Sequence, residues 1–168
     1  GTAYSTCMGK GTDLLKKHST NGTNLFKNVI ASSDAFTDVI ADSNGIIYAS
    51  DSKGYIYVYT RDGELIFCLG EKAGNNDVSG LFSSLTTIAV DNNGNIWTAD
   101  GKKGFIQSFT PTEYATTIYK ALQEYENGDY TDALKDWNYV LRLNQMSVLA
   151  HNGVAKAYYN DEEYDKAM

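Results

Sequence analysis

The segment TDVIADSNGIIYASD, residues 37–51, recurs as TTIAVDNNGNIWTAD at residues 86–100. The offset between the copies is constant, since Asp91 follows Asp42 by 49 positions. After one inserted residue the match continues into the aromatic segment that follows each copy. A chain that repeats itself over about 50 residues builds one small supersecondary unit per copy.

Each copy predicts a β-hairpin followed by further strands. The dipeptides Asn44-Gly45 and Asn93-Gly94 favour a two-residue type I′ turn, in which both positions need φ > 0. β-Branched and aromatic residues flank these turns, as strands prefer. Residues 61–67 supply another turn and an outer strand, and a weaker copy makes residues 1–26 the expected end of a preceding unit.

Short strands repeated every 40–50 residues are typical of β-propeller blades. The second copy also resembles the NHL repeat, whose glycines and apolar strand residues it carries in the same order. The matching positions are Gly70, Gly74, residues 80–82, 88–91 and 94–96, Asp100 and residues 106–109. The resemblance covers residues 27–110 and implies four-stranded NHL-type blades. About two to two and a half blades fit into residues 1–110, so we expect a partial propeller whose open strand edges favour self-association.

The pattern changes near residue 111 from strand alternation to helical spacing. Thr110, Pro111 and Glu113 form an S/T-x-x-E box with proline at the first helical position, which predicts a helix start. The sequence Asn127-Gly128-Asp129 predicts the end of this helix, with Asp129 capping a second helix and Ser147 a third. Two apolar stripes follow the helical spacing: Tyr114, Ile118, Ala121, Leu122 and Tyr125, then Tyr130, Ala133, Trp137, Val140 and Leu141.

Several residues of this half recur 34 positions later, as Tyr125 does at Tyr159. Together with the turn sequence GDYTDA at residues 128–133, this spacing resembles the tetratricopeptide repeat, in which small residues such as Ala121 and Ala133 let paired helices cross. The resemblance implies a solenoid of helical hairpins over residues 111–168, with a groove that binds a protein or peptide partner. The matching groove positions are Ile118, Leu122, Tyr125, Asn152, Lys156 and Tyr159. Solenoids need about three stacked repeats, so we expect the chain to be a piece of a longer protein.

Motifs for catalysis are absent from the sequence. Neither His18 nor His151 has a catalytic or metal-ligand spacing, and no H-E-x-x-H, G-x-S-x-G, P-loop or paired-cysteine pattern occurs. We expect His151 to be a partly buried packing residue, and we expect no cofactor. The oxygen-rich residues 42–45 and 91–95 suggest calcium ligands, but they lack EF-hand spacing. Hairpin turns in which Asp and Asn side chains bind the local backbone are the favoured interpretation.

The aromatic strand at residues 55–59 suggests either a sugar-stacking platform or packing between sheets. Its counterpart at residues 105–109 keeps aromatic residues at both ends, which favours packing. Tyr48 and Trp97 occupy equivalent positions, and we expect both to be packing residues as well.

The charge pattern argues against nucleic acid as a partner. The net charge is −7, with six basic against ten acidic residues in residues 27–112 and five against ten in residues 113–168. No apolar run of about 18 residues occurs, so contact with a membrane requires segments outside this sequence. Cys7 and Cys68 either pair or are two buried thiols, and the second is favoured.

These observations predict a β-then-α protein with propeller blades in residues 1–110 and tetratricopeptide-like helices in residues 111–168. The expected function is non-catalytic binding of a protein or another ligand. NHL blades followed by tetratricopeptide helices resemble bacterial envelope proteins, which implies an extracytoplasmic, membrane-anchored parent protein. The first alternative is a calcium-dependent propeller hydrolase of the lactonase type with appended helices. The second is a cytoplasmic assembly platform.

Overall fold

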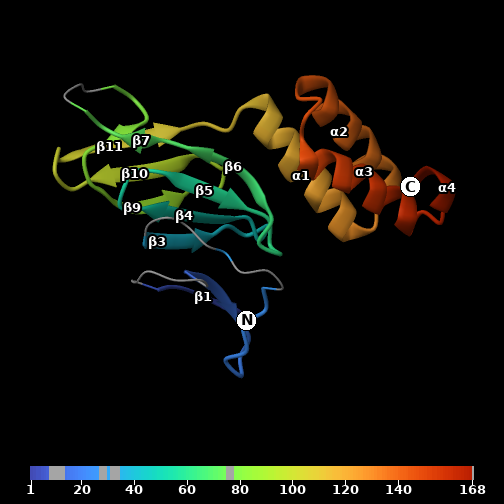
Figure 1. Cartoon of the computed structure of the whole chain (residues 1–168), viewed down its shortest axis with the longest axis horizontal. Helices are drawn as coiled ribbons and strands as arrows, with labels where there is room; N and C mark the ends of the chain where they lie inside the picture. The colour runs from blue at the N-terminus through green and yellow to red at the C-terminus, as the bar shows by residue number, and fades with distance from the viewer. Residues whose placement is uncertain (8–13, 27–29, 31–34, 75–77, 168) are drawn as a thin grey trace. The chain divides into compact units, whose positions relative to one another are not determined.

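A computed structural model describes residues 1–7, 14–26, 30, 35–74 and 78–167 (Figure 1). The chain divides into two units, Gly1–Thr110 and Pro111–Met168. The first unit contains antiparallel β-sheets and the second contains helices, so the prediction of a β-then-α chain is confirmed.

The first repeat forms a four-stranded antiparallel sheet in which each strand pairs with the next along the chain. Its strands are β3 (Phe36–Ala41), β4 (Ile47–Asp51), β5 (Ile56–Tyr59) and β6 (Leu65–Leu69). The hairpin, third strand and outer strand expected from the sequence are therefore present in this order.

The second repeat forms a three-stranded sheet in the order β11-β10-β9. Its strands are β9 (Leu85–Val90), β10 (Ile96–Asp100) and β11 (Phe105–Phe109). The short strands β7 (Glu71–Lys72) and β8 (Leu81–Phe82) pair in parallel, and β1 (Ala3–Thr6) pairs with β2 (Leu15–His18). Within the described residues, no fourth strand pairs with the outer edge of β11.

The hairpin turns differ from the predicted two-residue type. Gly45 and Gly94 have φ of 83° and 78°, whereas Asn44 and Asn93 do not have positive φ. The backbone N–H of Gly45 donates to the carbonyl of Asp42 at 3.1 Å, and the Asp42 N–H donates to Ile46 at 3.0 Å. These bonds enclose a three-residue loop with glycine in the left-handed position, a common alternative to the type I′ turn. The prediction of a type I′ turn was wrong because the Asn-Gly dipeptide is not the only constraint on the loop. The Asp side chain before it also accepts hydrogen bonds from the loop backbone.

The four-stranded sheet is covered on both faces. One face packs on a buried apolar cluster: Leu14, Leu15, Phe26, Ile30, Phe36, Ile47, Ala49 and Tyr59. Tyr48 alternates with Ile47 and Ala49, so its side chain leaves β4 on the opposite face, where β4 lies next to β9. Tyr48 is fully buried there. The two repeats are therefore stacked sheets with an apolar layer between them.

The helical unit contains α1 (Glu113–Asn127), α2 (Tyr130–Leu143), α3 (Val148–Asn160) and α4 (Tyr164–Ala167). Thr112, rather than Thr110, caps α1, and its side chain accepts the N–H of Ala115. Gly128 ends α1 in the left-handed conformation, as the Asn-Gly-Asp sequence predicts. Asp129 is the N-cap residue of α2 but its side chain makes no capping bond, whereas Ser147 caps α3 through the N–H of Ala150.

Small residues let these helices approach closely. Ala121 of α1 and Ala133 of α2 are fully buried, as expected for paired helices that cross. Gly153 of α3 lies against the indole of Trp137 of α2, and a Cβ atom added to Gly153 would lie 2.5 Å from Cδ2 of that ring. The contact between α2 and α3 therefore requires glycine at this position.

Candidate functional site

The helices α1 and α3 are joined at both of their ends. At the N-terminal ends, the Tyr114 hydroxyl donates to Oγ of Ser147 at 3.2 Å. At the C-terminal ends, Nδ2 of Asn160 donates to the Tyr125 hydroxyl at 2.7 Å. The two helices therefore run in the same direction and form one surface, which we call the α1–α3 surface.

The α1 residues predicted to line a groove are largely covered. Ile118 is 0% exposed and cannot contact a partner. Leu122 and Tyr125 are half-buried, and the Tyr125 ring packs on Tyr130 with centroids 5.4 Å apart. Helix α1 therefore contributes to the core of this unit more than to its open surface.

The α3 residues predicted for the groove are open to solvent. Asn152 and Lys156 are exposed, and Tyr159 is 62% exposed. Because they are spaced by four and three residues, all three lie on one face of α3. The Tyr159 ring packs on Tyr164 at 5.4 Å, which repeats the Tyr125–Tyr130 contact 34 residues earlier. The structure thus brings an amide, an ammonium group and an aromatic ring together on α3.

A charged cluster that was not predicted as a site joins α1 to α2. The Lys120 ammonium lies 2.7 Å from Oδ2 of Asp136 and 3.1 Å from Oε1 of Glu124. The other carboxylate oxygen of Glu124 is buried without a hydrogen-bond partner in the described part of the chain. Burial raises the pKa of Glu124, and the nearby Asp136 adds to the effect.

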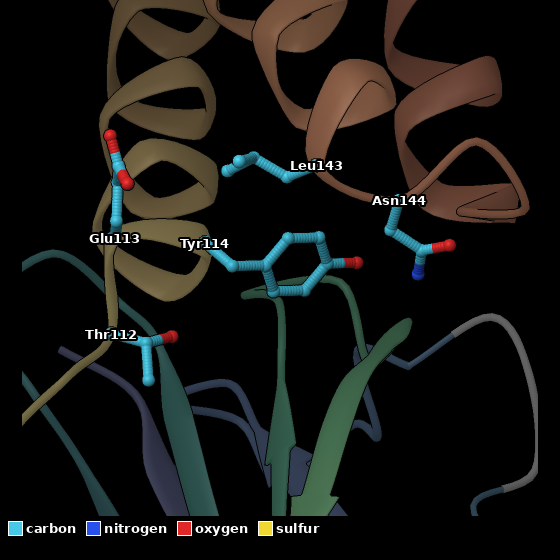
Figure 2. Close-up of a pocket in the computed structure, with 5 residues that line it drawn as sticks. All are labelled: Thr112, Glu113, Tyr114, Leu143 and Asn144. Carbon is cyan, nitrogen blue, oxygen red and sulfur yellow. The ribbon is translucent and has the colours of Figure 1, made fainter.

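A hollow of ≈ 290 Å³ lies at the N-terminal end of α1, lined by Thr112, Glu113, Tyr114, Leu143 and Asn144. Figure 2 shows the Tyr114 ring extending toward Asn144, with Leu143 above it. The Tyr139 hydroxyl donates to Oε1 of Glu113 at 2.6 Å, and this bond raises the pKa of Tyr139. No sequence pattern predicts this hollow, because its residues come from two separate helix ends.

The oxygen-rich loops use their carboxylates to bind backbone. Oδ1 of Asp42 accepts the N–H groups of Asn44 and Ile46, both at 2.9 Å. Oδ1 of Asp91 accepts the equivalent pair, from Asn93 at 2.9 Å and Asn95 at 3.0 Å. This pattern confirms the interpretation as hairpin turns. No cluster of three or more His, Cys, Asp or Glu residues suited to a metal ion occurs in the described residues.

The two loop carboxylates nevertheless have opposite pKa shifts. Hydrogen bonds from the Trp97 indole and the Asn95 amide lower the pKa of Asp91 to about 2. The indole Nε1 lies 3.0 Å from Oδ2 of Asp91. Burial instead raises the pKa of Asp42, although backbone N–H groups donate to it. Burial is the largest effect on the pKa of Asp42, whereas at Asp91 the two side-chain donors outweigh burial.

Three further expectations are corrected by the structure. His151 is exposed, with Nε2 3.0 Å from the carbonyl of Gln145, so the predicted partial burial was wrong. Cys7 and Cys68 are both free and exposed, so neither pairing nor burial describes them. Trp97 is 44% exposed and does not pack as Tyr48 does. In each case the sequence pattern does not reveal whether a neighbouring element covers the side chain.

The aromatic strand β5 behaves as a packing element. The Tyr57 ring stacks on Tyr59 at 6.3 Å and meets Phe36 edge-on at 5.6 Å. Its hydroxyl donates to Oδ2 of the buried Asp51 at 3.2 Å. These contacts confirm packing rather than a sugar-stacking platform. In the described part of the chain, no helix is both long and apolar enough to cross a membrane.

No protein-family model and no curated protein sequence matches this chain. Among solved structures, a streptogramin B lyase is similar with a TM-score of 0.44 and 14% sequence identity. The match covers 67% of this chain and 38% of the lyase chain, so this chain spans well under half of that protein's length.

Proposed function

We propose that this chain is a non-catalytic scaffold that binds a peptide or protein through the α1–α3 surface. Its sheets are blades of an NHL-type propeller and its helices are tetratricopeptide hairpins. The parent protein is membrane-anchored, with this part outside the cytoplasm. The binding proposal rests on one observation: Asn152, Lys156 and Tyr159 are all exposed and lie on the same face of α3.

The chemistry of this face suits an extended peptide with a carboxylate. An ammonium group and a primary amide donate to carboxylate oxygens, and bonds to a charged acceptor are about twice as strong as neutral ones. Tyr159 adds an apolar ring with a polar tip, which suits binding surfaces. The bond from Asn160 to Tyr125 supports a preformed surface, because it holds α3 against α1 without a ligand.

The repeat geometry supports the two family assignments. Sheets from consecutive repeats stack face to face, and a helical hairpin contact recurs after 34 residues. The assignment to the cell envelope follows from the order of these two repeat types, which is an argument by analogy.

The test is a peptide-binding assay with the full chain. Fluorescein-labelled random peptides with free C-terminal carboxylates are compared with the same peptides as amides, by fluorescence anisotropy. We expect the free-carboxylate peptides that bind to lose affinity by about tenfold or more with Lys156→Ala or Asn152→Ala, because each removes a bond to a charged group.

Lys135→Ala is the matched control, because Lys135 is an exposed lysine of α2 that pairs with Asp132 on its own helix. Equal binding of acids and amides, or equal losses with Lys156→Ala and Lys135→Ala, would contradict the proposed site.

A further inference from the structure

The same five-residue loop recurs in the sheet unit, and at residues 19–23, 42–46 and 91–95 it contains an Asn-Gly pair. In each of these copies, the N–H of the first residue donates to the carbonyl of the fifth at 3.0–3.1 Å. The glycine, in the fourth position, donates to the carbonyl of the first residue at 3.0–3.1 Å and has a φ of 78–83°. The three loops therefore hold their Asn-Gly pairs in the same backbone arrangement.

An Asn-Gly pair rearranges without an enzyme or a cofactor, and glycine favours the reaction because it has no side chain to hinder the approach. The glycine nitrogen loses its proton and attacks Cγ of the asparagine, which puts negative charge on Oδ1. The side-chain nitrogen then takes up a proton and leaves as ammonia, so that the new C–N bond closes a succinimide ring. Water opens this ring on either side, to aspartate or to isoaspartate.

The first residue of the loop decides how much charge surrounds this reaction. Oδ1 of Asp42 accepts the N–H groups of Asn44 and Ile46, which flank the attacking nitrogen of Gly45 along the chain. Oδ1 of Asp91 binds the equivalent pair in the third loop. A carboxylate this close opposes both the loss of the glycine proton and the negative charge that develops on the asparagine Oδ1.

The first loop begins instead with Ser19, which carries no charge. Its Oγ accepts the N–H of Thr23 at 3.1 Å, and its hydroxyl donates to Oδ1 of Asn21. A hydrogen-bond donor at this oxygen stabilises the negative charge that develops there during the attack. The first loop thus favours the rearrangement that the other two oppose.

The Asn-Gly pairs of the helical unit are held more firmly. Gly128 ends α1, and its N–H is shared between two carbonyls of the last turn. Gly153 lies within α3, where an added Cβ atom would already collide with Trp137. A succinimide ring requires the backbone to leave the helical conformation, so both pairs are protected while α1 and α3 are folded.

We infer that Asn21 is a modification site, at which the folded chain deamidates before its other Asn-Gly pairs. The product adds a carboxylate to a loop that has none, and isoaspartate also lengthens the backbone by a methylene group. The lengthened loop loses the 3.0 Å bond from the N–H of Gly22 to the carbonyl of Ser19, so the turn after β2 loosens as the protein ages.

The test is a timed incubation of the folded full chain at mildly alkaline pH. Proteolysis and tandem mass spectrometry then assign each deamidation to its asparagine, and an isoaspartate methyltransferase labels the isoaspartate product. We expect Asn21 to react about fivefold or more faster than Asn44 or Asn93, because a unit charge acts on their loops. Incubation in guanidinium chloride is the control, since the three rates should converge once the loops are unfolded.

Two substitutions exchange the loop types. Ser19→Asp should slow the deamidation of Asn21 to the rate of Asn44. Asp42→Asn should accelerate Asn44 by about fivefold, because it removes the charge and keeps a side-chain oxygen in the same place. Asn93 is the internal reference in both variants, and circular dichroism establishes that each is folded. Equal rates in the folded chain, or an Asn21 rate that Ser19→Asp leaves unchanged, would overturn the inference.

Discussion

The Oδ2 atom of Asp38 accepts a hydrogen bond from the Thr87 hydroxyl at 2.7 Å, although the two residues hold the same place in successive repeats. The same oxygen accepts the backbone N–H of Ile88 at 3.0 Å. One carboxylate of β3 thus joins its sheet to β9 of the next. The contact depends on the two repeats not being identical, because a second Asp at position 87 would repel the first.

The first prediction concerns this contact. Asp38→Ala leaves the N–H of Ile88 without its acceptor, so we expect the free energy of unfolding to fall by about 1–3 kcal/mol. Thr87→Ala removes one bond and leaves the backbone bond in place, with an expected loss of about 0.5–1.5 kcal/mol. Urea unfolding followed by circular dichroism at the β-sheet band measures both. Equal effects of the two variants would show that the bond to Ile88 contributes nothing.

The second prediction concerns Gly153. An added methyl group collides with the Trp137 indole, so Gly153→Ala should destabilise the helical unit by about 1–3 kcal/mol despite the better helix propensity of alanine. Asn152→Ala, one position earlier on the exposed side of α3, should be neutral or slightly stabilising. Urea unfolding followed by fluorescence of the buried Trp137 reports this unit in a Trp97→Phe background. A stable Gly153→Ala protein would contradict the close approach of α2 and α3.

The third prediction concerns the buried carboxylate of Glu124. Its pKa is raised by burial, so the folded state binds this proton more tightly than the unfolded state does. This group therefore lowers the free energy of unfolding as the pH rises above 4.5, the ordinary pKa of a glutamate side chain. We expect Glu124→Gln to gain stability relative to the unchanged chain as the pH is raised toward 7. Gln123→Ala, at an exposed and uncharged position of α1, removes no titrating group and should show no such trend. A constant difference across the pH series would contradict the raised pKa.

The fourth prediction concerns Asp91. Its pKa of about 2 lies below 3.8, the ordinary value of an aspartate side chain, so its contribution to stability is present above pH 3.8 and is lost as the pH falls toward 2. Trp97→Phe removes the indole donor and should raise the pKa of Asp91. Carboxyl NMR titration measures the shift directly, with Asp42 as the internal control because its own loop is unchanged. An unaltered Asp91 pKa would show that the indole bond is not formed in solution.

Much of the fold follows from sequence periodicity. The 49-residue repeat predicts two similar antiparallel sheets, and both Gly128 and Ser147 mark helix ends where the structure has them. These signals are local, because a left-handed glycine or a capping hydroxyl acts within one turn of chain. The type of hairpin loop was predicted wrongly, since the Asp42 side chain adds a constraint that the Asn-Gly dipeptide alone does not contain.

The candidate site was less predictable, because exposure depends on what lies on top of a residue. Ile118 and Tyr159 both match groove positions, yet the first is fully buried and the second is open. Tyr48 and Trp97 differ in the same way, although they are equivalent in the repeat. Spacing places a side chain on a face, but only the neighbouring layer decides whether that face is covered.

The Tyr125–Tyr130 and Tyr159–Tyr164 ring contacts stabilise successive helical hairpins separately. Where each hairpin is held by a copy of the same contact, opening one hairpin leaves the others nearly intact, and the unit loosens in steps rather than all at once. Backbone amides of α4 should then exchange with deuterium fastest and those of α1 and α2 slowest. Such a gradient lets the α4 end of the helical unit adapt its shape while the α1–α2 end stays rigid.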